Sequence, residues 1–306
     1  MRAIATTNLV TLVNGLVRLA RPKHWIKNVF VLLPVPFAVK AASQSNAATH
    51  FDALAFLLGL GGFCLLNSAV YSFNDLVDAR ADQHHPEKCH RPIAAGLVPV
   101  WAAIAEAVGL GAAGMILCAA ANKVGVLAIV LTYLAVNVAY NLGAKHVALV
   151  DVFLLASGFV LRVLLGCALV SASPSSWLLL CTSSLALFLG FAKRRADLHE
   201  GLDHKHRRSL RGYSLPFLSQ AMVICAGVAI LSYALYCITA VGLGILAPHR
   251  EMASMPFVVF GILNYLRMVD VENVGGSPVE VALHSLPTQL CGLGWVLAVT
   301  WSLGWW

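Results

Sequence analysis

The sequence predicts an all-α integral membrane protein, with nine transmembrane helices in one bundle around a central cavity that opens to the cytoplasm. Residues of the AVILMFWYC class make up 59% of the 306 residues, and Asp, Glu, Lys and Arg make up only 11%. Mean hydropathy is +0.79, whereas a soluble domain carries about 25% charged residues. Because each span needs about 20 residues, the chain is interpreted as a single domain, residues 1–306.

Nine apolar stretches run along the chain. They cover residues 28–42, 51–71, 99–121, 124–142, 148–170, 176–192, 218–247, 254–270 and 284–306. The first stretch contains Pro34 and Pro36, so its helix is expected to be broken or tilted. Residues 1–27 contain a short apolar run that Asn14 and Gly15 interrupt, without a cleavage site before the bases. This pattern predicts a retained amphipathic helix lying on the membrane.

The distribution of positive charge predicts the orientation. With the N-terminus in the cytoplasm, 17 of the 21 Lys and Arg residues fall on the cytoplasmic side, and Lys40, Lys123 and Arg250 fall on the other. The positive-inside rule therefore favours a site facing the cytoplasm, in the cytoplasmic (inner) membrane. The remaining base, Arg162, lies within the fifth stretch, where a charge costs a few kcal/mol and usually marks a functional site.

The net charge of +7 does not indicate nucleic-acid binding. A surface that stacks nucleobases needs aromatic residues among its lysines and arginines. Here the aromatic residues lie in apolar runs instead. The charge is therefore assigned to membrane topology and to an anionic ligand.

Two long polar loops, residues 72–98 and 193–217, both face the cytoplasm in this topology. They begin about 120 residues apart, each behind an apolar stretch, with four stretches from one to the other. Such spacing predicts two similar four-helix halves with one additional helix, whose loops face each other across one cavity.

The first loop contains three carboxylates in "NDLVDARAD". Asp75, Asp78 and Asp82 stand at i, i+3 and i+7, which places them on one face of a continuing helix. Crowded carboxylates repel one another unless a cation lies between them, and Mg²⁺ is commonly shared between one or two carboxylates and substrate phosphates. Asn74 can add an amide oxygen. The alternative is a solvated helix end, whose aspartates cap the helix or pair with bases such as Arg91.

Three histidines follow the aspartates. His84, His85 and His90 lie near Cys89, but their spacing matches no recurrent structural zinc site. Their role is left unassigned.

The second loop, "KRRADLHEGLDHKHRRSLRGY", carries basic as well as acidic residues. Its charged residues include Lys193, Arg194, Asp197, Glu200, Asp203, Lys205, Arg207, Arg208 and Arg211. Lysine and arginine side chains suit direct binding of phosphate oxygens. Two alternatives stay open, a second metal at Asp197 and Asp203 and anchoring of the loop to anionic lipid headgroups.

Two further cytoplasmic strings carry polar residues. "RPKHWIKN" places Lys23 and Lys27 one turn apart at the start of the first span, either as a positive-inside flank or as a phosphate clamp. "YNLGAKHVALVD" adds Tyr140, Asn141, Lys145 and Asp151.

Together these motifs resemble the UbiA superfamily of intramembrane prenyltransferases. The first motif has the NDxxDxxxD form, and a second charged motif follows the sixth span. The strings "RPKHWIKNVFVLLP", "HRPIAAG", "YNLGAKHVALVDVFLLASGFVLR" and "GGSPVEVAL" are similar to the branch that transfers phosphoribose to polyprenyl phosphates. Lys193 stands where other members carry the first acid of a DxxxD motif. This departure resembles the same branch and argues against a symmetric two-metal site for a prenyl diphosphate.

The resemblance implies Mg²⁺-dependent transfer of 5-phosphoribose from phosphoribosyl diphosphate to a decaprenyl-like polyprenyl phosphate, as in the synthesis of cell-wall arabinan precursors. Asp75, Asp78 and Asp82 would hold the metal, with Asp75, Asp78 and Lys193 as the catalytic residues that stabilise charge on the leaving diphosphate. The acceptor phosphate is already anionic, so the reaction requires no strong general base.

The remaining candidates are assigned to substrate binding. They are Lys23, Lys27, Asn74, Arg91, Tyr140, Lys145, Arg162, Arg194 and Asp197. Which base holds which phosphate stays open, and so does assembly into a homo-oligomer. One alternative function is a UbiA-type enzyme that moves a prenyl group from its diphosphate to an aromatic or other polar acceptor. The other is a lipid-binding or transport protein, against which the clustering of polar residues at one face argues.

Overall fold

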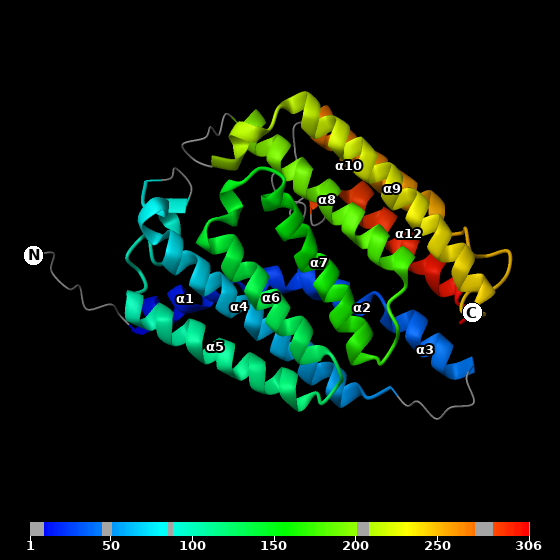
Figure 1. Cartoon of the computed structure of the whole chain (residues 1–306), viewed down its shortest axis with the longest axis horizontal. Helices are drawn as coiled ribbons and strands as arrows, with labels where there is room; N and C mark the ends of the chain where they lie inside the picture. Colours follow the sequence, from blue (N-terminus) through cyan, green and yellow to red (C-terminus); the bar gives the residue numbers. More distant parts are fainter. Residues whose placement is uncertain (1–8, 45–50, 85–87, 201–207, 273–283, 306) are drawn as a thin grey trace, which may run out of the picture.

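The computed structural model describes residues 9–44, 51–84, 88–200, 208–272 and 284–305. The regular structure within these ranges is α-helix, joined by short turns of 3₁₀ helix, so the all-α prediction is confirmed (Figure 1). The helices are α1 (Leu9–Ala20), α2 (Val29–Leu32), α3 (Val35–Gln44), α4 (Ala53–Asp82), α5 (Val100–Ala120), α6 (Val126–Leu142), α7 (Val150–Leu169), α8 (Ser176–His199), α9 (Leu215–Gly242), α10 (Met255–Asp270) and α12 (Leu286–Ser302). The 3₁₀ helices are η1 (Pro22–Asn28), η2 (Lys88–His90), η3 (Ala144–His146) and η4 (Arg208–Gly212).

Every predicted apolar stretch overlaps one of these helices, or the pair α2 and α3 in the case of the first stretch. Within the described ranges, six segments are long and apolar enough to cross a membrane. They are Leu9–Ser43, α4, α5, α7, α8 and α9. The apolar helix α6 is shorter, at 17 residues. The chain is an integral membrane protein, and the count of nine spans stays a prediction.

The break in the first stretch falls at its prolines. Helix α2 ends at Leu32 and α3 begins at Val35, on either side of Pro34. A proline cannot donate the helical hydrogen bond, and its ring clashes with the preceding turn. The predicted broken helix is therefore confirmed, and the short piece α2 is free to pack closely on α7. A Cβ added at Gly166 of α7 would lie 2.2 Å from the Val31 carbonyl oxygen.

The helices form two packed groups, which meet where α7 lies beside α8 (Figure 1). One apolar core joins α4, α5, α6 and α7 through side chains such as Phe63, Val130 and Leu165. Another joins α8, α9 and α10 through Phe188 and Met222, among others. Because apolar helices bury side chains only where they meet, these two cores fix the positions of α4 and α8, the helices that carry the charged motifs.

Helices α4 and α5 pack in direct backbone contact. A Cβ added at Gly62 would lie 2.7 Å from the Gly114 carbonyl oxygen, and a Cβ added at Gly114 would lie 2.7 Å from the Gly62 carbonyl oxygen. Glycine at both positions removes the side chains that would separate the helices. This contact fixes the lateral position of α4.

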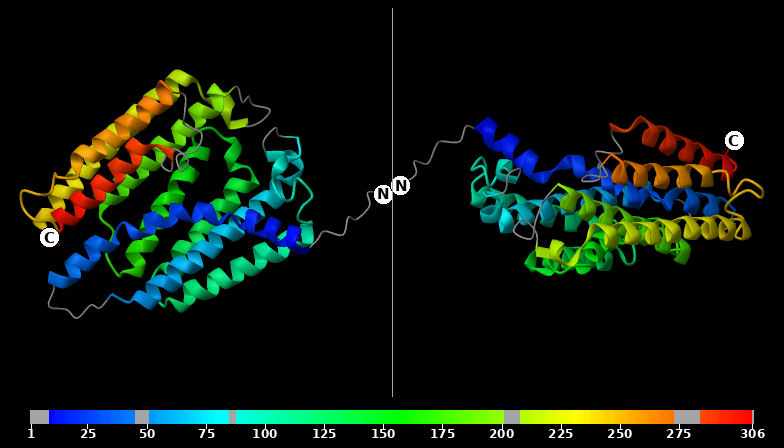
Figure 2. Two further views of the ribbon diagram at one scale, coloured as in Figure 1. Left: turned by 180° about the vertical axis from the view of Figure 1, so that it is seen from behind. Right: turned by 90° about the horizontal axis from the view of Figure 1, so that it is seen from above.

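Helix α1 lies against the charged end of α4 and the start of α5, at the rim of the bundle (Figure 2). Leu19 is buried there in a small core with Ile93 and Val98. The outward side chains of α1 include the exposed Val13 and Val17. The segment predicted over residues 1–27 is thus helical over Leu9–Ala20, and residues 1–8 lie outside the described ranges.

Candidate active site

Helix α4 carries the first motif on its last two turns. It runs without interruption for 30 residues from the apolar stretch to Asp82, and Asp52 caps its start by accepting a hydrogen bond from the Ala55 N–H at 2.9 Å. The predicted aspartates therefore stand on one continuing helix. The side chains of Asp75 and Asp82 are only 1% and 6% exposed, and that of Asp78 is 31% exposed.

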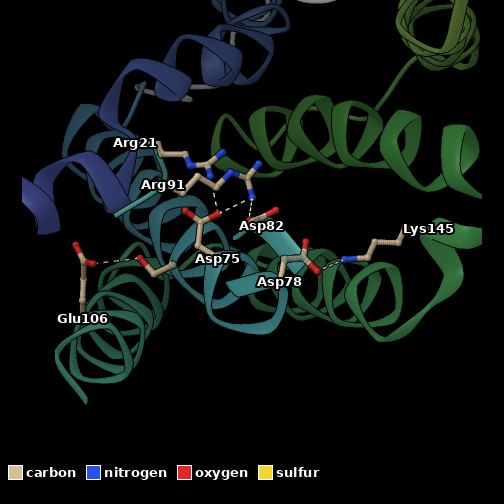
Figure 3. A network of polar contacts seen from close by, with 8 residues as sticks. Arg21, Asp75, Asp78, Asp82, Arg91, Glu106 and Lys145 are labelled. Carbon is tan, nitrogen blue, oxygen red and sulfur yellow. Dashed lines mark hydrogen bonds and ion pairs between the residues drawn. The ribbon is translucent and has the colours of Figure 1, made fainter. Parts of the chain in front are cut away.

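Two arginines from outside α4 pair with the buried aspartates (Figure 3). Arg21 Nη2 lies 2.6 Å from Asp75 Oδ1. Arg91 Nη1 lies 3.1 Å from the same oxygen and 2.7 Å from Asp82 Oδ2. Arg91 therefore bridges two carboxylates that stand two turns apart.

The third aspartate turns to a different base. Lys145 Nζ lies 2.6 Å from Asp78 Oδ1, and Figure 3 shows this pair directed away from the two arginines. Lys145 lies in η3, directly after α6, where Gly143 turns the chain with a φ of 142°. The structure thus brings the predicted Lys145 to the motif, and Tyr140, at the end of α6, is half-buried. We call Asp75, Asp78 and Asp82 with Arg21, Arg91 and Lys145 the aspartate cluster.

Arg21 was not among the predicted site residues. Its backbone is left-handed, with φ 50° and ψ 56°, a conformation that costs energy for a residue with a Cβ and is often found at functional sites. Its guanidinium also lies over the Tyr71 ring, at 5.3 Å from the ring centre. The only signal in the sequence is that Arg21 belongs to the same basic string as Lys23 and Lys27.

Another side of α4 is held by α5. Ser72 Oγ donates a hydrogen bond to Glu106 Oε2 at 3.3 Å (Figure 3). Glu106 is a half-buried acid that the sequence patterns did not single out.

Two oxygens of the motif lack a partner. Asp75 Oδ2 and Asn74 Oδ1 are buried and accept no hydrogen bond within the described part of the chain. Buried polar atoms are nearly always satisfied, and carboxylate and amide oxygens suit Mg²⁺, which often takes one or two protein ligands together with waters and phosphate oxygens. The residues therefore fit a magnesium ion at Asp75 and Asn74.

The three aspartates do not themselves form a preformed metal site. Among the described residues, no three His, Cys, Asp or Glu side chains are grouped as metal ligands. Asp78 and Asp82 are instead occupied by Lys145 and Arg91. Their role as metal ligands stays a prediction that requires these bases to move.

Arg162 lies inside the bundle and is 4% exposed. Its Nε donates to Asn28 Oδ1 at 3.0 Å, its Nη1 to the Gly158 carbonyl oxygen at 2.7 Å, and its Nη2 to Asn67 Oδ1. Three aromatic rings surround the guanidinium, those of Phe63, Tyr133 and Phe159, at 5.3 to 5.6 Å. The cation thus ties η1 and α4 to α7, and its role in binding phosphate stays a prediction.

The predicted bases Lys27 and Lys193 share one region with Arg162 and Arg21. Arg162 and Arg21 are close enough to Lys27 for their positive charges to repel it. Lys27, Arg21 and Lys193 are likewise close enough to repel a positive charge on the His24 ring. Lys27 is half-buried, whereas Lys193 and Lys23 are exposed. Bases from η1, α7 and α8 therefore concentrate positive charge beside the aspartate cluster.

Arg194 points elsewhere, into a buried set of polar residues. Its Nε lies 2.9 Å from Asp151 Oδ2, and its Nη1 lies 2.6 Å from Asp197 Oδ2. The side chains of Arg194 and Asp151 are 0% exposed. Ser209 Oγ donates to Asp151 Oδ2 at 3.0 Å, and Tyr213 Oη donates to Asp151 Oδ1 at 2.7 Å. We call these five residues the Arg194 network.

The network holds two loops together. Tyr213 Oη accepts a hydrogen bond from the Leu149 N–H at 2.6 Å, which ties the segment after η3 to the segment after η4. Burial, and then the hydrogen bond to Asp151, raise the pKa of Tyr213, so its hydroxyl remains a donor at neutral pH. The role of Arg194 and Asp197 in substrate binding stays a prediction.

Several predicted residues lie outside the described ranges. They are His85, Asp203, Lys205, Arg207 and the string "GGSPVEVAL". Of the other two histidines, the His84 ring nitrogen Nδ1 lies 3.1 Å from the Arg80 carbonyl oxygen, and the His90 carbonyl accepts from Arg18 at 3.4 Å.

Known proteins with similar sequences and folds agree with these observations. The model of the UbiA prenyltransferase family matches residues 31–277. A decaprenyl-phosphate phosphoribosyltransferase from Corynebacterium glutamicum is 36% identical over 302 residues, which cover 95% of this chain and 87% of that protein. The protein of the same name from Mycobacterium tuberculosis is 33% identical over 302 residues, covering 97% of this chain and 96% of that one.

A solved structure has the same fold. The structure of a UbiA homologue from Archaeoglobus fulgidus bound to GPP and Mg²⁺ matches with a TM-score of 0.69 and 17% identity, covering 95% of this chain and 98% of that one. The family match covers most of the chain, and the relatives match it over nearly its full length. The chain therefore belongs to the UbiA prenyltransferase family.

Proposed function

We propose that this protein transfers 5-phosphoribose from phosphoribosyl diphosphate to a polyprenyl phosphate in the membrane. The observation that carries the proposal is the similarity, over nearly the full chain, to two proteins named decaprenyl-phosphate phosphoribosyltransferase. The aspartate cluster supports it, because acids and bases at one end of α4 suit a ligand that combines a metal ion with several phosphates. A place in the synthesis of cell-wall arabinan precursors belongs to the same proposal.

Mg²⁺ is the proposed cofactor, with Asp75 and Asn74 as ligands and with Asp78 and Asp82 joining when their bases leave. When bound, the ion would neutralise charge on the leaving diphosphate. The support is the pair of unpartnered oxygens on Asp75 and Asn74 and the presence of Mg²⁺ in the Archaeoglobus structure.

The bases perform the remaining steps of the proposed reaction. Arg21, Arg91 and Lys145 now neutralise the carboxylates, and each can turn its donors to phosphate oxygens when metal takes over that task. Lys193 and Lys27, whose charges both reach the His24 ring, would stabilise the negative charge that develops as the bond to the anomeric carbon of the ribose breaks. The acceptor phosphate is anionic at neutral pH, so its oxygen attacks without a general base.

The membrane arrangement is part of the proposal. We expect nine spans in one domain, residues 1–306, with residues 1–27 on the membrane surface and the loops 72–98 and 193–217 in the cytoplasm, at the inner membrane. The support is the charge distribution, which leaves only three of the 21 Lys and Arg residues on the opposite side, and the exposed apolar side chains of α1.

The test is direct transfer. Purified protein is incubated with Mg²⁺, phosphoribosyl diphosphate labelled in the ribose, and polyprenyl phosphates of several chain lengths, and label extracted into organic solvent is counted. We expect extractable label that disappears when the metal is chelated or the lipid is omitted. No extractable label with any lipid would reject the proposal. Consumption of a prenyl diphosphate with an aromatic acceptor under the same conditions would then support prenyl transfer.

A further inference from the structure

Asn141, on the last turn of α6, has a buried side-chain amide. The residue is 5% exposed, and Oδ1 and Nδ2 have no hydrogen-bond partner in the described part of the chain. Leaving a buried amide unpaired is costly, and native proteins rarely do so without a functional reason. A ligand that enters the site can supply the missing partners.

The position of Asn141 on α6 directs it toward the neighbouring helices. Val126, Val130, Tyr133, Asn137 and Asn141 fall within an arc of about 80° on the helix, and four of the five are buried. Tyr133 on this stripe donates a hydrogen bond to Asn67 Oδ1 of α4 at 3.1 Å. Asn141 therefore lies on the face of α6 that packs against the bundle.

The height of Asn141 along the bundle matches that of the first motif. Helices α4 and α6 run in the same direction, because α5, which connects them along the chain, runs in the opposite direction (Figure 1). Asn67 on α4 contacts Tyr133 on α6. Eight residues further along each helix, a rise of about 12 Å, lie Asp75 on α4 and Asn141 on α6. Lys145, four residues further on, contacts Asp78, which agrees with this alignment.

Unpartnered buried atoms thus lie at the same height on two neighbouring helices. Asn74 Oδ1 and Asp75 Oδ2 come from α4, and the whole amide of Asn141 comes from α6. The α4 atoms are acceptors only, which a metal ion can satisfy. The Asn141 amide differs, because it offers an acceptor and a donor side by side.

We propose that Asn141 recognises the hydroxyl groups of the pentose in the donor substrate. A hydroxyl both donates and accepts, so a pair of neighbouring hydroxyls satisfies Oδ1 and Nδ2 together. A phosphate would leave Oδ1 without a donor, and a metal ion would leave Nδ2 without an acceptor. The arginines and lysines of the site already supply partners for phosphates. This assignment rests on the proposed function, since it requires a sugar donor.

The experiment compares Asn141→Leu with Asn137→Leu. Asn137 lies one turn earlier on the same stripe, and its Nδ2 donates to the Tyr133 carbonyl oxygen at 2.8 Å, so it is a nearby half-buried amide with a partner. For each protein we would measure the melting temperature in detergent, the KM for phosphoribosyl diphosphate and for the lipid, and inhibition by ribose 5-phosphate and by 2-deoxyribose 5-phosphate.

We expect Asn141→Leu to melt no lower than the wild type, because the substitution removes an unsatisfied polar group. Its KM for phosphoribosyl diphosphate should rise by about ten- to a hundredfold, with the KM for the lipid unchanged. The wild type should prefer ribose 5-phosphate over its 2-deoxy counterpart, and the variant should lose this preference because a site lacking the amide cannot read the hydroxyl. Asn137→Leu should melt lower and keep the preference.

Three results would overturn the assignment. The first is a donor KM and a sugar preference in Asn141→Leu that equal those of the wild type. The second is an equal rise in the KM for donor and for lipid, together with a lower melting temperature. The third is that Mg²⁺ alone no longer raises the melting temperature of the variant, which would assign the amide to the metal. If Asn141→Leu does not fold, Asn141→Asp, which keeps the acceptor and lacks the donor, makes the same comparison. A wild type that transfers no phosphoribose rejects the proposed function and this assignment together, whereas an active wild type with an unaffected variant rejects only the assignment.

Discussion

The aspartate cluster and the Arg194 network use the same residue types in opposite ways. Both pair aspartates with arginines at the charged end of a long helix, α4 or α8. In the network, Arg194 and Asp151 are fully buried, and Ser209 and Tyr213 complete the hydrogen bonds of Asp151. In the cluster, the side chains of the bases are 15 to 25% exposed.

The difference lies in what it costs to exchange a partner. Removing one member of a fully buried pair strands a charge away from water, whereas a base at the edge of water is released at lower cost, and a metal ion can replace its charge. The network is therefore suited to holding loops in place. The cluster is suited to replacing its bases by metal and phosphate. Burial, more than residue type, separates the two tasks.

The largest expected effect is on catalysis at Asp75. Asp75→Asn removes the charge that two arginines share and a carboxylate oxygen assigned to the metal, so phosphoribose transfer should fall by at least about a hundredfold. Extraction of labelled lipid measures it. Asp52→Asn is the matched control, since asparagine also caps helices well and Asp52 lies at the opposite end of α4. Full activity in Asp75→Asn or Asp78→Asn would remove the metal assignment.

Breaking the network should mainly affect stability. Arg194→Met leaves Asp151 buried without its cation and should destabilise the protein by about 3–5 kcal/mol, seen as a lower melting temperature in detergent. The double variant Arg194→Met with Asp151→Leu should recover much of this loss, because neither charge remains. A single variant that melts like the wild type but no longer binds phosphoribosyl diphosphate would instead show that Arg194 contacts the ligand.

The same substitution in the cluster should show the reverse pattern. Arg91→Met should cost less stability than Arg194→Met, because the Arg91 side chain is 25% exposed and Arg21 still pairs with Asp75. Transfer should fall by about ten- to a hundredfold, since a charged hydrogen bond to the ligand is lost. Arg91→Lys should recover part of the activity. A large fall in melting temperature with normal kinetics would mean that the cluster, too, is structural.

The smallest expected effect is at Tyr213. Tyr213→Phe removes the hydroxyl that joins Asp151 to the Leu149 N–H and should cost about 1 kcal/mol. Because burial and Asp151 raise the pKa of this hydroxyl, it stays protonated from pH 6 to 9 in the wild type. The pH profiles of the two proteins should therefore have the same shape over that range, and a shifted limb in the variant would contradict the structural role.

The sequence predicts well what local pattern decides. An apolar run of membrane length must be helical, because only a helix satisfies its own backbone in lipid, and each of the nine stretches overlaps a helix. The break at Pro34 and the continuous helix under Asp75, Asp78 and Asp82 follow from equally local rules.

Pairing across the chain is beyond such rules. Arg21 and Asp75 are 54 residues apart in the sequence, and no local pattern says which of the several bases reaches which acid. Lys193 and Arg194 are neighbours, yet one is exposed and the other fully buried, because adjacent residues on a helix point about 100° apart. Both looked equally suited to phosphate, and only packing distinguishes them.

The uninterrupted course of α4 also sets the depth at which the chemistry takes place. Its apolar part, residues 53–71, extends for about 28 Å at 1.5 Å per residue, close to the thickness of about 30 Å of a hydrocarbon layer. Asp75 follows four residues later, about 6 Å further along the axis. An α4 that crosses the membrane upright would therefore bring the carboxylates to the headgroup layer, where a lipid phosphate acceptor would meet the site without being lifted out of the bilayer.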